Sequence, residues 1–589
     1  MTTISKYKTE WDLNKHFFKS INDPEIDKII EETKLNVSEF ATKYNGLIHR
    51  LNTPLFLSYL EESAQLFKPL TKVYYFFSYL STLDTQDQEV LKKINGIYTL
   101  WSDLSKQLVF VNEEYKLIGY DNLIALSEDP ILKDYKNYLK SNADNLKYLL
   151  DENVEKALIE TGKVITIFND LYDELTNSFT YPFKGEMKGR AEVASKRESE
   201  NEEERKEAFD SLNGVFGQKS NQIVIGNLYK SICKSNVASI KNRGYESVME
   251  VRNISEDMDN NTVNNLLDKV RINFPIYHEF LKIKAKLLGK KKLDYWDIFA
   301  PIPKPGEETK FPFEKGLELY LENIKDFDLE LYEYSKKVFE DGRVTVFPKD
   351  GKRDGAYASY GKDFESFVML NYVDTFGDIT TLAHELGHAF HGFLSQDQKE
   401  QVYNSPLSLA ETASIFNETL LFENLLSGIS KEEKAHYVAM KLDDFFSTTF
   451  RQVMYVLFER ECHQRFLDGE ELSYEDFNEV WFRYLSELYG DSVKLGDNMK
   501  YGWASIPHIY NTPFYCYAYS FGNILSFNLY QMYKETNKED FVKIYKDILR
   551  SGGSMRPKEL LMRNGIDIDG DLFYERAFDV AKNLIKELK

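Results

Sequence analysis

Residues 382–391 read Leu-Ala-His-Glu-Leu-Gly-His-Ala-Phe-His, and this stretch decides how the rest of the chain is interpreted. Residues four apart on an α-helix share one face, so His384 and His388 can bind one cation through neutral imidazoles. Glu385 would project beside the same site. Asp378 is the predicted N-cap, which would place both histidines well inside the helix. This spacing is typical of the zinc-binding helix of the zincin fold.

A catalytic zinc site needs a third protein ligand and one open position. The metzincin pattern puts a third histidine ten residues after the first, but that residue is Leu394. The alternative is a glutamate on a following helix, which Ser405 and Pro406 are expected to begin. Glu411 and Glu418 would then lie two turns apart on one face. We choose Glu411 as the ligand and expect Glu418 to support a ligand histidine from the second shell.

The predicted chemistry is hydrolysis that uses one Zn²⁺ ion per chain. The ion would be held by His384, His388 and Glu411, and it would activate water for attack on a carbonyl. Glu385 is the expected general base, and it would carry the proton to the leaving amine. His391 lies one turn beyond His388, where either a structural role or a supporting contact in the second shell fits.

Residues 501–533 contain no Asp, Glu, Lys or Arg, in a chain otherwise rich in them. We expect this segment to be largely buried or to line a cavity. Two prolines, many tyrosines and several polar side chains make the segment too polar for a membrane span, so that alternative is rejected. Imidazole and phenol groups can stabilise an oxyanion, although a tyrosine cluster can also serve packing alone. The candidate donors are His508, Tyr510, Tyr515, Tyr517 and Tyr519.

Composition and charge narrow the class of protein. With 42% hydrophobic and 29% well-mixed charged residues, the 589-residue chain is expected to fold as a globular protein. The formal net charge of −21 would repel phosphate backbones, so a nucleic-acid partner is not expected. The three cysteines lie far apart, which indicates neither disulfides nor a cysteine zinc site. The first 20 residues lack a signal peptide's apolar core, so we predict a cytoplasmic protein. Oligomeric state is not predicted.

The apolar pattern predicts a mainly helical fold. Apolar residues recur at three-and-four spacing in residues 26–44 and again in 154–175. Strand-like runs are few: residues 344–347 precede a turn-rich stretch and residues 367–372 follow it. The sequence therefore predicts a small sheet beside the histidine helix.

Two features bear on domain organisation. Proline and glycine interrupt the helical pattern within residues 181–185, which favours a boundary there. We predict an N-terminal helical region over residues 1–184 and a catalytic region over residues 185–589. The charged run 197–207 fits either a flexible linker or the exposed face of a helix, and the apolar residues after it favour the helix.

The chain resembles the M3 oligopeptidases, and within them the oligoendopeptidase F group. The resemblance extends over nearly the whole chain. It is carried by residues 382–391, by Ala-Glu-Thr-Ala-Ser at 410–414 with Phe-Asn-Glu at 416–418, by Pro-His at 507–508 with Pro-Phe-Tyr-Cys-Tyr at 513–517, and by Trp-Asp-Leu at 11–13. It implies a large helical zincin of the gluzincin type, split by a deep channel that residues 1–184 cover. Such a channel admits oligopeptides and excludes folded proteins.

The resemblance also implies roles for individual residues. Glu411 matches the family's third zinc ligand, and Glu418 matches a supporting carboxylate. His508 and the tyrosines match a segment that binds the substrate and the transition state. We choose His508 and Tyr517 as catalytic donors, and Tyr510, Tyr515 and Tyr519 as substrate-binding residues. Residues 367–372 resemble a strand that lines the cleft, where an extended peptide could pair; a core strand is the alternative.

The function predicted from these observations is zinc-dependent hydrolysis of internal peptide bonds in short oligopeptides. A non-catalytic peptide-binding protein with the same fold is one alternative, although the intact metal-binding pattern argues against it. A zinc exopeptidase is another. It would need an anchor for a chain terminus, and the sequence offers no evident one.

Overall fold

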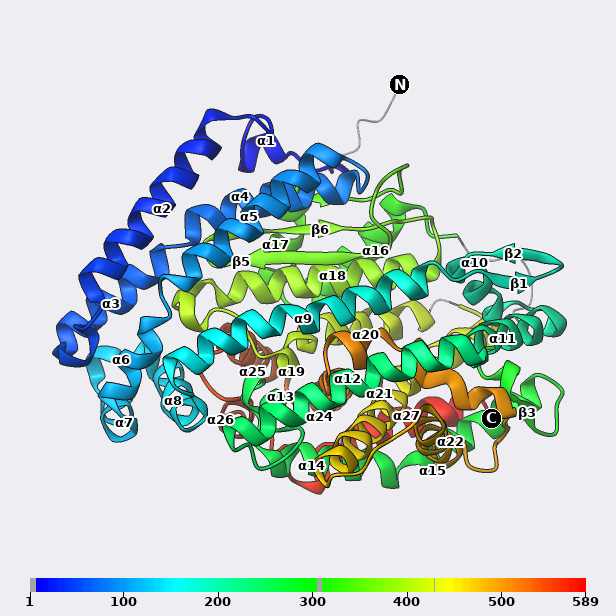
Figure 1. Ribbon diagram of the computed structural model, residues 1–589. Helices are drawn as coiled ribbons and strands as arrows, with labels where there is room; N and C mark the ends of the chain where they lie inside the picture. The colour runs from blue at the N-terminus through cyan, green and yellow to red at the C-terminus, as the bar shows by residue number, and fades with distance from the viewer. Residues whose placement is uncertain (1–6, 304–309, 428) are drawn as a thin grey trace. The chain divides into compact units, whose positions relative to one another are not determined.

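The computed structural model describes residues 7–303, 310–427 and 429–589, and these form two compact units (Figure 1). Unit 1 comprises Met1–Glu152, Thr309–Asn424 and Glu535–Asn564. Unit 2 comprises Asn153–Glu308, Leu425–Lys534 and Gly565–Lys589. Each unit is therefore assembled from three separate stretches of chain. The predicted division of roles between residues 1–184 and 185–589 stays a prediction.

Unit 1 contains the predicted sheet and the histidine helix. Its helices and strands are α1 (Leu13–His16), α2 (Pro24–Tyr44), α3 (Thr53–Gln65), α4 (Lys68–Leu83), α5 (Gln88–Lys106), α6 (Phe110–Ile118), α7 (Tyr120–Ser127), α8 (Lys136–Asn145), α16 (Phe313–Phe327), α17 (Leu329–Glu340), β4 (Val344–Thr345), β5 (Tyr357–Gly361), β6 (Phe364–Met369), α18 (Phe376–Leu394), α19 (Leu407–Ala410), α20 (Thr412–Ser427), α25 (Lys538–Arg550) and α26 (Pro557–Arg563). Polar caps help define these helices; α2, for example, has Asp23 as its N-cap and Pro24 in its first turn.

The sheet of unit 1 has the order β4-β6-β5. β6 is the central strand, parallel to β4 and antiparallel to β5, and its residues Phe367, Val368 and Met369 are buried. Trp11 joins the N-terminal helices to this core, because its indole N–H donates to the Val368 carbonyl at 2.9 Å. α18 packs against β5 and β6 (Figure 1). The small sheet beside the histidine helix is therefore confirmed.

Unit 2 is also mainly helical. Its elements are α9 (Glu152–Asn177), β1 (Tyr181–Phe183), β2 (Glu186–Lys188), α10 (Arg190–Ser195), α11 (Glu202–Gly217), α12 (Lys219–Arg243), α13 (Glu250–Ser255), α14 (Asn260–Ile272), α15 (Phe274–Leu287), β3 (Leu293–Asp294), α21 (Lys431–Leu467), α22 (Tyr474–Tyr489), β7 (Val493–Lys494), α23 (Pro507–Asn511), α24 (Tyr517–Glu535) and α27 (Asp571–Glu587). α12 packs against α21 and α22, while α11 packs against the 3₁₀ segment Asp497–Ser505.

Two sequence features of unit 2 take clear structural forms. The charged run 197–207 leads into α11, as the helical interpretation predicts. The Pro-Gly interruption is an antiparallel hairpin of β1 and β2, and Lys184 and Gly185 turn the chain with positive φ angles of 50° and 77°. Among the described residues, every helix is too short or too polar to cross a lipid bilayer.

Candidate metal and catalytic site

The start of α18 is fixed by a capping box. The Thr375 side chain accepts a hydrogen bond from the Asp378 backbone N–H, and the Asp378 carboxylate accepts one from the Thr375 N–H at 2.8 Å. The helix therefore begins at Phe376, and Asp378 is its third residue. The prediction that Asp378 is the N-cap was wrong, because the preceding threonine takes that role. Both histidines still lie well inside the helix.

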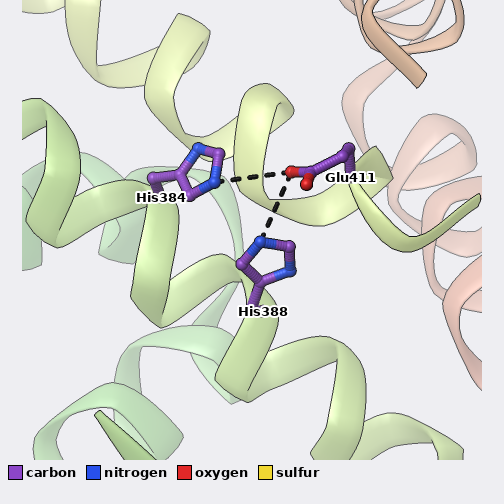
Figure 2. Close-up of side chains that lie close together, drawn as sticks. All are labelled: His384, His388 and Glu411. Carbon is purple, nitrogen blue, oxygen red and sulfur yellow. Dashed lines mark ion pairs between the residues drawn. The ribbon is translucent and has the colours of Figure 1, made fainter. Parts of the chain in front are cut away.

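The two histidines of α18 point at one carboxylate (Figure 2). Glu411 Oε2 lies 3.4 Å from His384 Nε2 and 3.3 Å from His388 Nε2. The imidazole rings are 4.9 Å apart between centroids, as expected for neighbours on one helical face. The three donor atoms all lie within 4.8 Å of one another.

These distances fit a zinc ion. Nitrogen and carboxylate ligands bind zinc at about 2.0–2.2 Å, so two ligand atoms at the tetrahedral angle lie about 3.4 Å apart. The separations of 3.3 and 3.4 Å at Glu411 Oε2 match that value. Two imidazoles with one carboxylate also form a donor set that catalytic zinc uses. His384, His388 and Glu411 could therefore hold the ion.

Glu411 lies at a break between two helices, which the single predicted helix did not foresee. α19 ends at Ala410, and α20 begins at Thr412. The Ser414 hydroxyl donates to Glu411 Oε2 at 2.7 Å and helps to orient the carboxylate. Gly387 allows α18 to approach the segment that carries Glu411 closely, because a Cβ atom at this position would lie 2.6 Å from the Ala413 carbonyl oxygen.

Glu418 contacts the other side of the His384 ring. Its Oε2 atom lies 3.4 Å from His384 Nδ1, while Nε2 faces Glu411. Burial alone would lower the pKa of His384, but the hydrogen bond to Glu418 and the charge of Glu411 outweigh it and raise the pKa to about 9. Burial alone would raise the pKa of Glu411, but His388 and His384 lower it to about 2. The two charges attract each other, and a bound metal ion would replace the proton of His384, because histidine binds zinc as a neutral imidazole.

Glu385 faces the same cavity and is almost completely buried, with 6% of its surface exposed. Burial raises its pKa, although the charges of His384 and His388 and the backbone N–H of Ala358 act in the opposite direction. A raised pKa suits a carboxylate that takes up a proton during a reaction. Glu385 thus lies on the cavity beside the candidate metal ligands, with a raised pKa.

A cavity of about 550 Å³ connects these groups with a strand that the sequence did not predict. Residues 356–360 line it together with His384, Glu385, His388 and Glu411. This segment includes most of β5, which is an edge strand within the described sheet. Of the two interpretations of residues 367–372, the core strand is the one that holds for residues 367–369, because β6 is buried there and already has a neighbouring strand on each side.

His391 lies on α18 with the two candidate ligands, but its own contacts are different. It is buried, and its Nε2 atom lies 2.9 Å from the Ser405 hydroxyl. Burial, together with the charge of His388, lowers the pKa of His391 to about 4, so the ring is neutral at pH 7. The contact ties α18 to the start of the segment that carries Glu411. This geometry suits a supporting role.

The uncharged segment contributes the remaining candidate residues, all of them in unit 2. His508 stacks on Tyr515 with ring centroids 6.1 Å apart, and Tyr519 lies 4.9 Å from Tyr515. These three side chains are partly exposed. Tyr510 and Tyr517 differ, because they are 1% and 0% exposed. As the absence of charge predicted, most of α24 is buried.

The turn before α24 depends on a residue that the sequence reasoning missed. Phe514 has a positive φ of 62°, and its backbone N–H donates to Glu459 Oε1 at 2.9 Å. Glu459 is fully buried, and burial raises its pKa to about 8. The Arg252 side chain donates to the Pro513 carbonyl at 3.3 Å. Glu459 and Arg252 thus hold the residues directly before Tyr515.

Comparison with known proteins establishes the family. The sequence pattern of peptidase family M3 matches residues 195–580. The chain belongs to peptidase family M3. An oligoendopeptidase F homolog of Borreliella burgdorferi is 29% identical over 592 residues, covering 98% of each chain. An oligoendopeptidase F of Lactococcus lactis subsp. cremoris is 26% identical and covers 100% of this chain and 96% of its own.

Solved structures agree with this assignment. A structure from Chlamydophila abortus has a TM-score of 0.83 at 25% identity, covering 95% of this chain and 96% of its own. Oligoendopeptidase-F from Enterococcus faecium has a TM-score of 0.71 at 21% identity, covering 96% and 98%, and shows the fold. The predicted family and the mainly helical fold of this M3 peptidase are therefore confirmed.

Two structural features near the candidate residues of the M3 peptidase have only weak signals in the sequence. β5 follows the turn-rich residues 349–355, and its sequence Tyr-Ala-Ser-Tyr-Gly lacks the regular alternation of apolar and polar residues that predicts a strand. Glu459 lies in the long helix α21, which contains several glutamates, and its sequence context does not distinguish it from the others. Both features depend on contacts between segments that are distant in sequence: β5 pairs with β6, and Glu459 binds the backbone of Phe514.

Proposed function

We propose that this M3 peptidase is a zinc-dependent endopeptidase that hydrolyses internal bonds of oligopeptides in the cytoplasm. The observation that carries the proposal is the convergence of His384, His388 and Glu411, with separations of 3.3 and 3.4 Å at the carboxylate oxygen. Glu385 lies beside them on the same cavity. One zinc ion per chain would occupy this position. Oligopeptides are the substrates that the family and these residues support together.

Each residue of the site has a distinct task in this proposal. A zinc ion bound there would polarise the carbonyl as a Lewis acid and would lower the pKa of water toward about 7. The Glu385 carboxylate takes the proton of the attacking water and passes it to the leaving nitrogen. Glu418 holds His384 through Nδ1, so that Nε2 keeps its direction. His391 holds Ser405 and thereby supports the segment that carries Glu411.

The edge strand β5 is the proposed surface for the peptide backbone. Residues 356–360 lie along the cavity that contains Glu385. An extended peptide can add to an exposed edge by main-chain hydrogen bonds, which do not depend on side-chain identity. Gly392 supports this arrangement, because a Cβ atom there would lie 2.4 Å from the Tyr360 ring. Binding through β5 would therefore suit peptides of varied sequence.

His508 and the tyrosines are proposed to donate hydrogen bonds to the substrate or the transition state. Burial lowers the pKa of His508, so its ring is neutral at pH 7. The partly exposed Tyr515 and Tyr519 suit ligand contact better than the buried Tyr517. We therefore favour the first two as donors of phenolic hydroxyl groups. The Tyr510 ring stacks on the Tyr172 ring with their centroids 3.7 Å apart, which suits a packing role.

Peptides blocked at both ends test the proposed activity directly. The purified chain is incubated with an N-acetylated and C-amidated peptide of about ten residues, and the products are analysed by mass spectrometry. We expect cleavage at internal bonds, loss of activity on treatment with a chelator, and recovery when zinc is restored. Cleavage only of peptides with a free terminus would identify an exopeptidase instead. Binding without cleavage in the zinc-loaded protein would favour the non-catalytic alternative.

A further inference from the structure

Unit 2 contains a second cavity, of about 140 Å³, that the proposed peptidase chemistry does not use. Three arginines line it: Arg190 at the start of α10, Arg197 in the 3₁₀ turn Lys196–Glu198, and Arg451 on α21. Its other walls include the aromatic side chains of Phe209, Phe299, Tyr455, Trp481 and Tyr489. The cavity therefore gathers three positive groups within a chain whose net charge is −21.

Two of the guanidinium groups share one aromatic ring. The Arg451 Cζ atom lies 4.9 Å from the centroid of Phe299, and the Arg197 Cζ atom lies 5.1 Å from the same centroid. Cation–π attraction holds each group in place but does not neutralise it. Arg190 is anchored separately, because it donates to the Ser505 carbonyl at 2.8 Å. The positive groups are thus fixed in position around the cavity.

The positive charge of the cavity is not balanced by ion pairs. Among the described residues, no carboxylate forms an ion pair with Arg190, Arg197 or Arg451. Asp443 is the nearby acid, and its carboxylate binds Lys284 Nζ at 2.7 Å; against the effect of burial, its charge helps to raise the pKa of Arg451 without forming an ion pair with that arginine. Burial lowers the pKa of Arg197, and the charge of Arg451 lowers it further, which shows that the two cations repel each other. Glu198 acts on Arg197 only from beyond ion-pair distance.

We propose that this cavity binds a small oxyanion of the phosphate class. Guanidinium groups bind phosphate oxygens through paired, charge-assisted hydrogen bonds, which are strongest where water is largely excluded. Three arginines suit a ligand with two or more negative charges better than a single carboxylate. The volume accommodates an ion of this size with some water, since one water needs only about 10–15 Å³ on the same measure. The ligand would relieve the repulsion between Arg197 and Arg451 and link α10 to α21.

A binding experiment with inorganic phosphate and pyrophosphate tests the proposal. The full-length, zinc-loaded chain is titrated by calorimetry in a buffer free of other multivalent anions, and its melting temperature is followed in parallel. We expect binding that raises the melting temperature. Arg197→Gln and Arg451→Gln should each weaken the affinity about tenfold or more, because each removes a charge-assisted contact. Arg483→Gln is the matched control, since this arginine is 52% exposed on the cavity-lining helix α22.

Chemical protection gives a second result that does not depend on how the variants fold. Phenylglyoxal modifies accessible arginines, and peptide mapping reports the extent of modification at each position. We expect phosphate to protect Arg197 and Arg451 in the unmodified chain while leaving Arg483 reactive. Phosphate binding unchanged by both substitutions would place the ion elsewhere, the zinc site included, and would overturn the proposal. Protection by an acetylated peptide with a free carboxyl end, but not by phosphate, would also overturn it.

Discussion

The histidine pair of α18 and the tyrosine pair before and within α24 follow the same spacing but differ in how readily it is recognised. His384 and His388 are four residues apart, and their ring centroids lie 4.9 Å apart. Tyr515 and Tyr519 are also four apart, and their centroids lie 4.9 Å apart as well. Tyr517 falls between them and is buried. A spacing of four residues thus brings the two tyrosine rings together as it does the two histidine rings, although Tyr515 lies in the turn before the helix.

The two regions differ in what the surrounding chain supplies. Around the histidines, carboxylates from another segment create charge, with Glu411 and Glu418 on opposite sides of the His384 ring. Around the tyrosines, the charged groups lie at the edge of the cluster: Arg252 Cζ lies 6.0 Å from the centroid of the Tyr515 ring, and Glu459 and Arg252 also hydrogen-bond the backbone of the turn. The first region therefore suits the proposed cation binding and proton transfer, whereas the second suits the proposed donation of hydrogen bonds. Substitutions in the two regions should have correspondingly different effects.

The largest effect is expected at the proposed base. Glu385→Gln keeps the size of the side chain but cannot accept a proton, so we expect kcat to fall by about 10²–10⁴-fold. Zinc content should not change, because this residue is not one of the three proposed ligands. Turnover of an internally quenched peptide and metal analysis measure the two properties. Glu423→Gln, at an exposed position on α20, is the control. Undiminished turnover of Glu385→Gln would reject the assignment.

Substitutions of the two glutamates beside His384, Glu411 and Glu418, should weaken zinc binding to different extents. Glu411→Ala removes a proposed ligand and should weaken zinc binding more than 100-fold, whereas loss of an outer partner such as Glu418 typically costs about 10–100-fold. Competition with a chromogenic chelator measures both dissociation constants, and Glu423→Ala provides the reference. If Glu418→Ala loses zinc more readily than Glu411→Ala, the two roles must be exchanged.

The sequence predicts the histidine region well because its geometry is local. Four-residue spacing on a helix determines the relation of His384 to His388 without knowledge of the rest of the fold. The break at Glu411 and the pairing of β5 with β6 depend on contacts between distant segments. Gly387 shows the same limit. A side chain at this position would collide with the backbone of Ala413, and the sequence alone does not show that the two segments lie so close together. Sequence spacing therefore predicts which side chains share one face of a helix, but it does not predict which other segments that face contacts.

The tyrosine region allows a test of that lesson. If exposure decides which hydroxyl contacts the substrate, then Tyr515→Phe or Tyr519→Phe should lower kcat by about 10²-fold, the typical cost of losing one oxyanion donor. Tyr517→Phe should leave kcat nearly unchanged, because its hydroxyl is buried and has no hydrogen-bond partner in the described structure. Steady-state kinetics on one quenched peptide compare the three. The largest loss at Tyr517 would instead support the original choice of donor.

The effect expected at the turn that Glu459 holds is on stability and does not involve the reaction itself. Its pKa is about 8 in the folded chain and about 4.5 without the fold, so the folded chain binds the extra proton between these values. The stability that this group contributes is present below about pH 4.5 and is lost as the pH rises through about 8. The loss amounts to at most about 1.4 kcal/mol per pH unit. Glu459→Gln keeps an acceptor for the Phe514 N–H but cannot ionise.

Melting curves recorded from pH 5 to pH 9 measure this difference. We expect the melting temperature of the unmodified chain to fall relative to that of Glu459→Gln as the pH rises toward 8, and the difference to level off above it. Glu461→Gln, at the neighbouring and more exposed glutamate of α21, controls for general charge effects. Parallel curves for Glu459→Gln and the unmodified chain would mean that the buried carboxyl is already ionised at neutral pH. In that case a charged hydrogen bond, rather than a neutral one, would hold the turn before Tyr515, and the two regions would be more alike than their burial suggests.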